Sequence, residues 1–286
     1  MTDTGAYVQS LMVMHPLIDP ITRSAIRALQ LPSGSRGLDA GCGIGIEALM
    51  LAAAVGPAGH ITGLDLCPEH LACAREIVER DGLSERISFQ QGDLRELPFE
   101  DNTFDWAWGK DAVAEAPQYG LEAMATVKEL ARVVKPGGAV AILTWSSQML
   151  LPGFPRLEAH LEATSAGIAP FTGASRPETH SLRGLGWLRN AGLQELSAQT
   201  FVGDACAPLS GEQRAALTEL LQERWAGVES ELTSEERAEY RRLCLPESPD
   251  FILNLPDYYA FWTYSMFHGR VAENRAGSWP LLRASA

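Results

Sequence analysis

The chain has 286 residues, of which 46% are apolar, and its 23 Lys and Arg against 36 Asp and Glu give a formal net charge of -13. A globular chain of this length buries about 75% of its unfolded surface, so it needs no disulfide or metal staples and is not expected to be disordered. The acidic charge argues against a duplex nucleic-acid binder, whose affinity depends on Lys and Arg, and against an anionic membrane surface.

The cysteines and the N-terminus indicate the expected compartment. The five cysteines are odd in number, scattered, and form no C-x-x-C pair, which is typical of a reducing compartment. The N-terminus lacks a basic start followed by an apolar stretch, and the longest apolar run, 48–55, is far shorter than the roughly 20 residues that span a bilayer. We therefore expect a cytoplasmic protein without membrane insertion.

An N-terminal helical cap is expected over residues 1–30. Asp19-Pro20 offers an N-cap and a first-turn proline for a helix that runs to about Leu29. A separate short helix is expected over 7–14.

Residues 36–145 alternate short apolar or β-branched runs with segments of helical periodicity. This alternation predicts a parallel sheet with helices on both faces. The expected strands are 37–40, 60–65, 87–90, 104–108 and 139–145. The expected helices are 46–55, 68–81 and 120–134, and glycine–proline pairs end two of them.

The alternation lapses after residue 145. A proline-containing, loop-rich stretch at about 146–181 is interpreted as an insertion, followed by a helix at 182–191 and strands at 193–202 and 259–271. Charges and leucines at helical spacing over 212–229 and 234–243 predict a second, helical insertion at about 210–256. We expect one domain over 31–286 in which both insertions act as a lid.

The most informative segment joins a strand to a helix through glycines and reads LDAGCGIGIE over residues 38–47. Glycines there leave backbone N–H groups accessible to a ligand at the carboxyl edge of the sheet. Asp65, at the end of the next strand, is placed to accept both hydroxyls of a ribose. The glycines fall as G-x-G-x-G rather than G-x-G-x-x-G, which favours a ligand without a pyrophosphate.

This segment also resembles the first signature of class I S-adenosylmethionine-dependent methyltransferases. Residues 91–94 (QGDL), 104–108 (FDWAW) and 130–138 (LARVVKPGG) are similar to three later segments of that family, in order and in register. The resemblance is to the small-molecule type, the sterol, tocopherol and quinone methyltransferases. It implies an α/β fold, a Rossmann-like doubly wound sheet of seven strands with an N-terminal helical segment and helical lid insertions.

The resemblance further implies that the cofactor is S-adenosyl-L-methionine. Its methionine part would be lined by Gly41, Gly43 and Gly45. Asp39 would lie near its amino group. Asp65 would accept the ribose hydroxyls. The adenine would lie against Leu66 and Leu94 and donate to Asp93, and Cys42 and Lys110 are also expected to border the cofactor. The alternatives are turn capping for Asp39 and Asp93, and ordinary core packing for the leucines.

Catalytic candidates come from the loop after the fourth strand, which faces the donor methyl in this family. Asp111 stands where the related enzymes carry an acidic residue, and Glu115 stands where many of them carry His. Either carboxylate is equally consistent with helix capping or with pairing to Lys110. His15 and His268 are further candidates because one lies in the segment that closes over the donor and the other in the last strand. No histidine spacing indicates a metal site.

The expected activity is therefore methyl transfer to oxygen or carbon of a small, fairly hydrophobic acceptor, which is quinone-like, aromatic, terpenoid or polyketide-type, as in secondary metabolism. The aromatic residues of the second half favour an apolar pocket under the lid. A small-molecule partner, no nucleic acid, and a monomer or homodimer are expected. The alternatives are a nicotinamide-dependent reductase, whose Tyr-x-x-x-Lys pattern is absent, and a non-catalytic regulatory module that binds the nucleoside.

Overall fold

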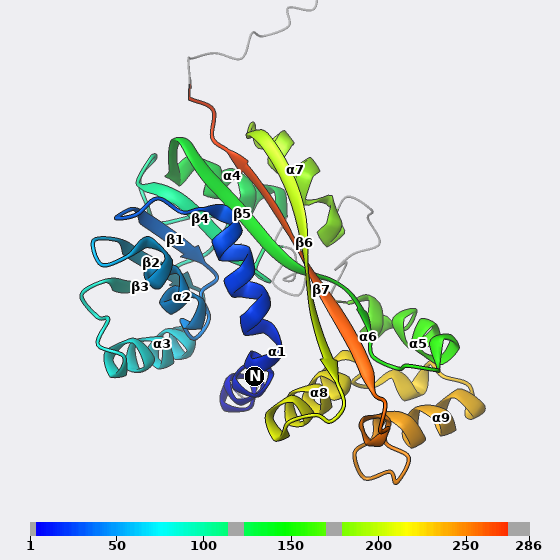
Figure 1. Cartoon of the computed structure of the whole chain (residues 1–286). Coiled ribbons are helices and arrows are strands. Elements are labelled where there is room, and N and C mark those ends of the chain that lie inside the picture. The colour runs from blue at the N-terminus through cyan, green and yellow to red at the C-terminus, as the bar shows by residue number, and fades with distance from the viewer. Residues whose placement is uncertain (1–3, 114–122, 170–178, 274–286) are drawn as a thin grey trace, which may run out of the picture.

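A seven-stranded sheet in the order β3-β2-β1-β4-β5-β7-β6 forms the centre of the computed structural model, which describes residues 4–113, 123–169 and 179–273 (Figure 1). Its first four strands are β1 (Arg36–Ala40), β2 (His60–Asp65), β3 (Ile87–Gln91) and β4 (Phe104–Lys110). They run parallel to one another and to β5 (Val134–Met149). Strand β7 (Tyr259–Arg270) is antiparallel to both β5 and β6 (Gln194–Cys206). The expected α/β, doubly wound fold is confirmed.

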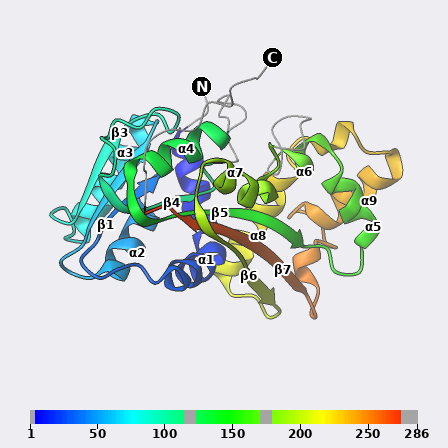
Figure 2. The same cartoon turned by 90° about the horizontal axis from the view of Figure 1, so that it is seen from above.

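Helices cover both faces of the sheet (Figure 2). On one face, Trp106 and Trp108 share a buried apolar cluster with residues of α1 (Thr4–Leu29), α2 (Ile46–Val55) and α8 (Gly211–Arg224). On the other face, Leu38, Val140 and Phe267 share a cluster with residues of α4 (Ala123–Val133) and α7 (Gly184–Asn190). Helix α3 (Pro68–Arg80) joins β2 to β3. These two apolar layers fix the carboxyl ends of the parallel strands at one edge of the sheet.

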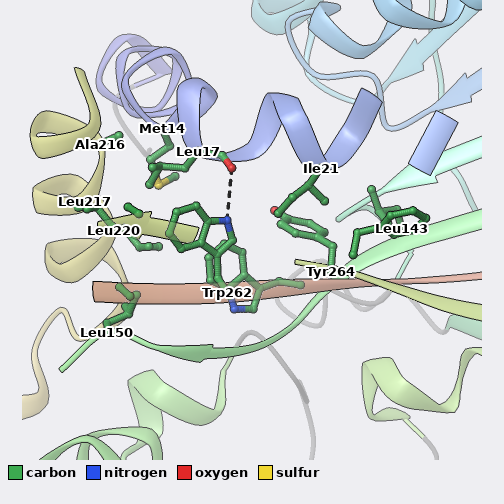
Figure 3. Packing of buried hydrophobic residues seen from close by; sticks show 14 of the residues in the cluster. Met14, Leu17, Ile21, Leu143, Leu150, Ala216, Leu217, Leu220, Trp262 and Tyr264 are labelled. Carbon is green, nitrogen blue, oxygen red and sulfur yellow. Dashed lines mark hydrogen bonds between the residues drawn. The ribbon is translucent and has the colours of Figure 1, made fainter. Parts of the chain in front are cut away.

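The N-terminal segment differs from the prediction, because α1 is one helix that contains both Pro16 and Pro20. Asp19 does not cap a helix there; its carboxylate accepts hydrogen bonds from Arg23 one turn later. Packing overrides the helix-breaking effect of proline. Figure 3 shows the apolar stripe that packs around Trp262, and the indole N–H of Trp262 donates to the Leu17 main-chain oxygen at 3.3 Å.

Strands β5, β6 and β7 extend beyond the rest of the sheet and lead into a group of helices (Figure 1). We call this group, α5 (Pro155–Glu162), α6 (Ser165–Ile168), α8 and α9 (Ser234–Cys244), the helical cap. Short 3-10 helices lie at η3 (Ser181–Arg183), η4 (Val228–Ser230) and η5 (Ile252–Asn254). The expected strand 139–145 is therefore longer at both ends, and the stretch expected to be loop-rich contains α5 and α6.

Local sequence explains where the cap helices begin. Ser210 with Gln213, and Thr233 with Glu236, form reciprocal capping boxes at the starts of α8 and α9. No helix among the described residues combines the length and the apolar character needed to traverse a lipid bilayer.

Candidate cofactor and acceptor site

The glycine turn between β1 and α2 adopts a backbone that other residues rarely adopt. Gly41, Gly43 and Gly45 have φ angles of 78°, 49° and 79°. A Cβ added at Gly45 would lie 2.9 Å from the Phe89 ring, so this glycine lets α2 pack closely. A Cβ added at Gly43 would meet nothing within 4 Å. The backbone at Gly43 is therefore open to a ligand.

Asp65, at the end of β2, lies beside this turn. Its Oδ2 accepts the Gly43 N–H at 2.9 Å, and its Oδ1 accepts the Cys67 N–H at 2.9 Å. Each carboxylate oxygen keeps a further lone pair with which to accept a ligand hydroxyl. The neighbouring Leu66 is 53% exposed, so it offers an apolar surface next to that carboxylate. The structure thus brings Gly43, Asp65 and Leu66 together at the end of β2.

His70 is a neighbour of Asp65 that was not among the candidate residues. Its Nδ1 lies 3.4 Å from Asp65 Oδ1. The sequence feature that could have identified His70 is its place in the first turn of α3, shortly after the strand that ends in Asp65.

Asp39 is a buried carboxylate with an unsatisfied oxygen. Its Oδ2 has no hydrogen-bond partner among the residues that the structure describes. Burial, followed by the nearby charge of Glu47, raises the pKa of Asp39 well above its ordinary value. A ligand ammonium group would satisfy this oxygen. An open backbone, an acceptor for hydroxyls and a buried acceptor for an amine together fit S-adenosylmethionine.

The predicted adenine contacts are only partly assembled. Both oxygens of Asp93 bind Arg95, whose backbone N–H and guanidinium lie 2.6–3.0 Å away. These hydrogen bonds lower the pKa of Asp93. They correspond to the turn-capping alternative considered for this residue. Leu94, in contrast, is buried and its Cδ1 lies 3.7 Å from the position of a Cβ on Gly41, so it does reach the glycine turn.

Cys42 turns its side chain into the protein. A Cβ built on Gly63 of β2 would lie 2.9 Å from the Cys42 sulfur, and burial raises the pKa of this thiol. The backbone of Cys42 borders the turn, but its N–H already donates to the Leu64 oxygen at 2.9 Å. Its side chain is directed against β2 rather than toward the open backbone of Gly43.

Lys110 connects the glycine turn to the end of β4. Its Nζ lies 2.9 Å from Glu47 Oε1 and 3.6 Å from Asp111 Oδ2. Burial would raise the pKa of Glu47, but the charge and hydrogen bond of Lys110 hold it below its ordinary value. The sequence interpretation missed Glu47. The available signal was an acidic residue in the first turn of the helix after the glycines, where the helix dipole favours it.

Asp111 follows β4 in a left-handed backbone conformation, with a φ of 50°. Such a conformation costs a non-glycine residue about 1–3 kcal/mol and persists only where the surroundings impose it. Its Oδ1 accepts the Trp145 N–H at 3.1 Å, and its Oδ2 accepts the Tyr264 hydroxyl at 2.9 Å. Tyr264 was not among the catalytic candidates, because no local pattern relates it to Asp111. Glu115 lies outside the described residues.

The two histidine candidates are placed differently. His15, on α1, lies near enough to Glu47 to contribute to its lowered pKa, and its Nε2 is 3.9 Å from Asp19 Oδ1. His268 lies four residues beyond Tyr264 on β7, about 13 Å away at the rise of an extended strand. The fold therefore separates His268 from the other candidates. Among the described residues, no cluster of His, Cys, Asp or Glu could hold a metal ion.

Comparison with known proteins identifies the central part of the chain. Residues 38–138 match the family described as methyltransferase domain. Over this stretch the chain is similar to a methyltransferase domain. The resemblance to class I, S-adenosylmethionine-dependent methyltransferases that the sequence motifs indicated is confirmed there.

Curated relatives match about half of the chain. Demethylmenaquinone methyltransferase of Bacillus cytotoxicus is 38% identical over 135 residues, which are 47% of this chain and 54% of the relative. The Staphylococcus aureus protein of the same name is 34% identical over 137 residues, covering 48% and 54%. The chain thus spans about half the length of the curated relatives it matches.

Solved structures share the fold over a longer stretch. The YcgJ protein of Bacillus subtilis aligns with a TM-score of 0.53 at 18% identity, over 90% of this chain and 100% of its own. Phosphoethanolamine N-methyltransferase 2 of Haemonchus contortus, in complex with S-adenosyl-L-methionine, aligns with a TM-score of 0.52 at 16% identity, over 92% and 56%. At these identities the likeness concerns the fold alone.

Proposed function

We propose that this protein transfers a methyl group from S-adenosylmethionine to oxygen or carbon of a small, fairly hydrophobic acceptor. The observation that carries the proposal is the convergence of the open Gly43 backbone, the Asp65 carboxylate and the unsatisfied Asp39 oxygen at one edge of a methyltransferase domain. Asp65 would accept the ribose hydroxyls, and Asp39 would receive the amino group of the methionine part.

The acceptor would bind between the end of β4 and the helical cap, with the cap acting as a lid. Asp111 lies beside the glycine turn that would hold the methyl donor, because the Cβ of its neighbour Ala112 is only 2.3 Å from where a Cβ of Gly41 would be. On the cap side, Glu223 near the end of α8 lies within electrostatic range of Asp111: desolvation raises its pKa, Arg224 opposes that rise, and the charges of Glu219 and then Asp111 add to it. A quinone-like or other aromatic acceptor suits the aromatic rings nearby, and the names of the curated relatives support it.

The bound cofactor supplies an electrophilic methyl group, so the chain chiefly has to align a nucleophile with it and exclude water. Asp111 is the group we assign to the acceptor. Its carboxylate would receive the hydrogen bond of an acceptor hydroxyl and take up the proton that leaves as the new bond to the methyl carbon forms. The electron pair of the broken carbon–sulfur bond stays on sulfur, which yields S-adenosylhomocysteine.

Calorimetric titration with S-adenosylmethionine tests the proposed binding of the methyl donor. Asp65→Asn should weaken binding at least 10-fold, because it removes a charge and one hydroxyl acceptor. Asp105→Asn is the matched control: Asp105, like Asp65, accepts a backbone N–H, in this case that of Arg36 at 2.7 Å, but at the opposite edge of the sheet. Leu66→Ala, at an exposed position, should weaken binding about 5-fold without affecting folding. Unchanged affinity in both site variants would refute the placement.

Measurement of turnover tests the proposed methylation of a small-molecule acceptor. The protein, S-adenosylmethionine and a panel that includes 1,4-naphthohydroquinone and catechol should yield S-adenosylhomocysteine and a product heavier by one methyl group. Donor binding without turnover on any acceptor would favour the regulatory module. Binding of NADH instead of S-adenosylmethionine would favour the reductase.

A further inference from the structure

Tyr264 joins the last strand of the sheet to the end of β4. Its side chain is 2% exposed, and its ring packs edge-on against Trp145 with centroids 5.3 Å apart. Its hydroxyl donates to Asp111 Oδ2 at 2.9 Å, although the two residues lie 153 positions apart in the chain. Figure 3 shows Tyr264 on β7, in the layer between this strand and α1.

Three hydrogen bonds hold Asp111 in its left-handed conformation. Its N–H donates to the Leu143 oxygen at 2.9 Å, and its Oδ1 accepts the Trp145 N–H at 3.1 Å, so β5 supplies two of the three. Tyr264 supplies the third and acts on the other carboxylate oxygen. A strained backbone maintained by several independent bonds is typical of functional sites.

Lys110 forms an ion pair with the same oxygen. Its Nζ lies 3.6 Å from Asp111 Oδ2 and 2.9 Å from Glu47, at the base of the glycine turn. Tyr264 and Lys110 therefore share Oδ2, one from the β7 side and the other from the donor side. Without the tyrosine hydroxyl, the nearest described partner of Oδ2 would be the lysine, and the carboxylate would be free to turn toward it.

We infer that Tyr264 is a positioning residue: its hydroxyl keeps the Asp111 carboxylate directed at the acceptor instead of at Lys110. The inference rests on the proposed function, in which Asp111 receives the hydrogen of the acceptor. A displacement of about 1 Å at a reacting group can lower a rate 100-fold, so the hydroxyl has a kinetic effect without contacting either substrate.

The kinetic test is Tyr264→Phe, which removes only the hydroxyl. Turnover of 1,4-naphthohydroquinone, or of whichever acceptor in the panel reacts fastest, should fall 10- to 100-fold in kcat. The dissociation constant of S-adenosylmethionine should stay within 2-fold. Tyr258→Phe is the matched control, since Tyr258 is 1% exposed and its hydroxyl donates to the Leu150 oxygen at 3.1 Å, away from Asp111. Equal losses of kcat in both variants would make the Tyr264 effect merely structural and overturn the inference.

Two further measurements keep the inference distinct from the proposed function. In an Asp111→Asn background, Tyr264→Phe should cause little additional loss of kcat, because the positioned carboxylate is already gone; independent, multiplying losses would overturn the inference. Crystal structures of the wild type and Tyr264→Phe should show the Asp111 carboxylate turned toward Lys110 in the variant. This readout needs no turnover, so it decides the positioning role even if the acceptor class is wrong, and an unmoved carboxylate would refute it.

Discussion

Lys110 forms an ion pair with Glu47, Nζ to Oε1 at 2.9 Å, that ties the end of β4 to the first turn of α2. The two side chains are only 15% and 20% exposed. Because the Asp39 and Asp111 carboxylates lie nearby, this lysine balances more negative charge than any single partner carries.

Substitutions of Lys110 and of Glu47 should therefore differ in their effect on the free energy of unfolding. Lys110→Met leaves three carboxylates without the lysine charge and should cost about 3–5 kcal/mol of unfolding free energy. Glu47→Gln leaves the lysine beside Asp39 and Asp111 and should cost about 1 kcal/mol. Urea unfolding of both variants at pH 7 measures the difference. The reverse order would show that Glu47, rather than Lys110, holds the cluster together.

Asp39→Asn should stabilise the ligand-free protein while weakening the donor site. Burial raises the pKa of Asp39, so its ionised form lowers folding stability at neutral pH, and a neutral amide of the same shape avoids that cost. Removing an unfavourable buried charge of this kind commonly raises the free energy of unfolding by about 0.5–2 kcal/mol. The gain should shrink as the pH falls toward about 4, the ordinary pKa of Asp, where the folded wild type is also neutral. Denaturation midpoints measured from pH 4 to 8, paired with calorimetry, check both effects; a gain independent of pH would contradict this explanation.

Trp262→Phe should loosen the N-terminal helix. The substitution removes the hydrogen bond to the Leu17 oxygen and leaves a cavity among the apolar residues of Figure 3, at a cost of about 2–4 kcal/mol. Because α1 packs on this indole, limited proteolysis should cut within α1 faster than in the wild type. Cleavage that accelerates equally in α9 would instead indicate global destabilisation.

Glu236 should contribute to acid sensitivity of the cap. Hydrogen bonds from Thr233, followed by the contact with His160, lower the pKa of Glu236 to about 2. A lowered folded-state pKa stabilises the protein above the unfolded value of about 4.3, and this contribution is lost as the pH falls through about 2. Glu236→Gln should be less stable than the wild type at pH 6, and the difference should close between pH 4 and 2 in urea titrations. Glu235→Gln, at the exposed neighbouring position, should show no such convergence.

Local sequence was sufficient for the parallel half of the sheet. Strand β2 and helix α2 have the predicted bounds, because apolar periodicity and glycine–proline stops act over a few residues. The positions of Gly43 and Asp65 follow from the same rule, since Gly43 lies in the turn after β1, Asp65 ends β2, and parallel strands end at one edge. The N-terminal helix shows the limit of this reasoning: Pro20 indicated a helix start, and only packing against α8 and β7 keeps that residue inside a longer helix.

What the sequence by itself determined was that the glycine turn after β1 and Asp65 lie at one edge of the sheet, because they belong to neighbouring strand ends with a regular spacing. Only the tertiary structure decided which side chains meet across it. Tyr264 reaches Asp111 because β7 pairs antiparallel with β5, and Lys110 meets Glu47 because β4 lies next to β1 in the sheet. Such contacts depend on the order of the strands, and that order is set by the burial of the whole sheet between its two helical layers rather than by any local pattern.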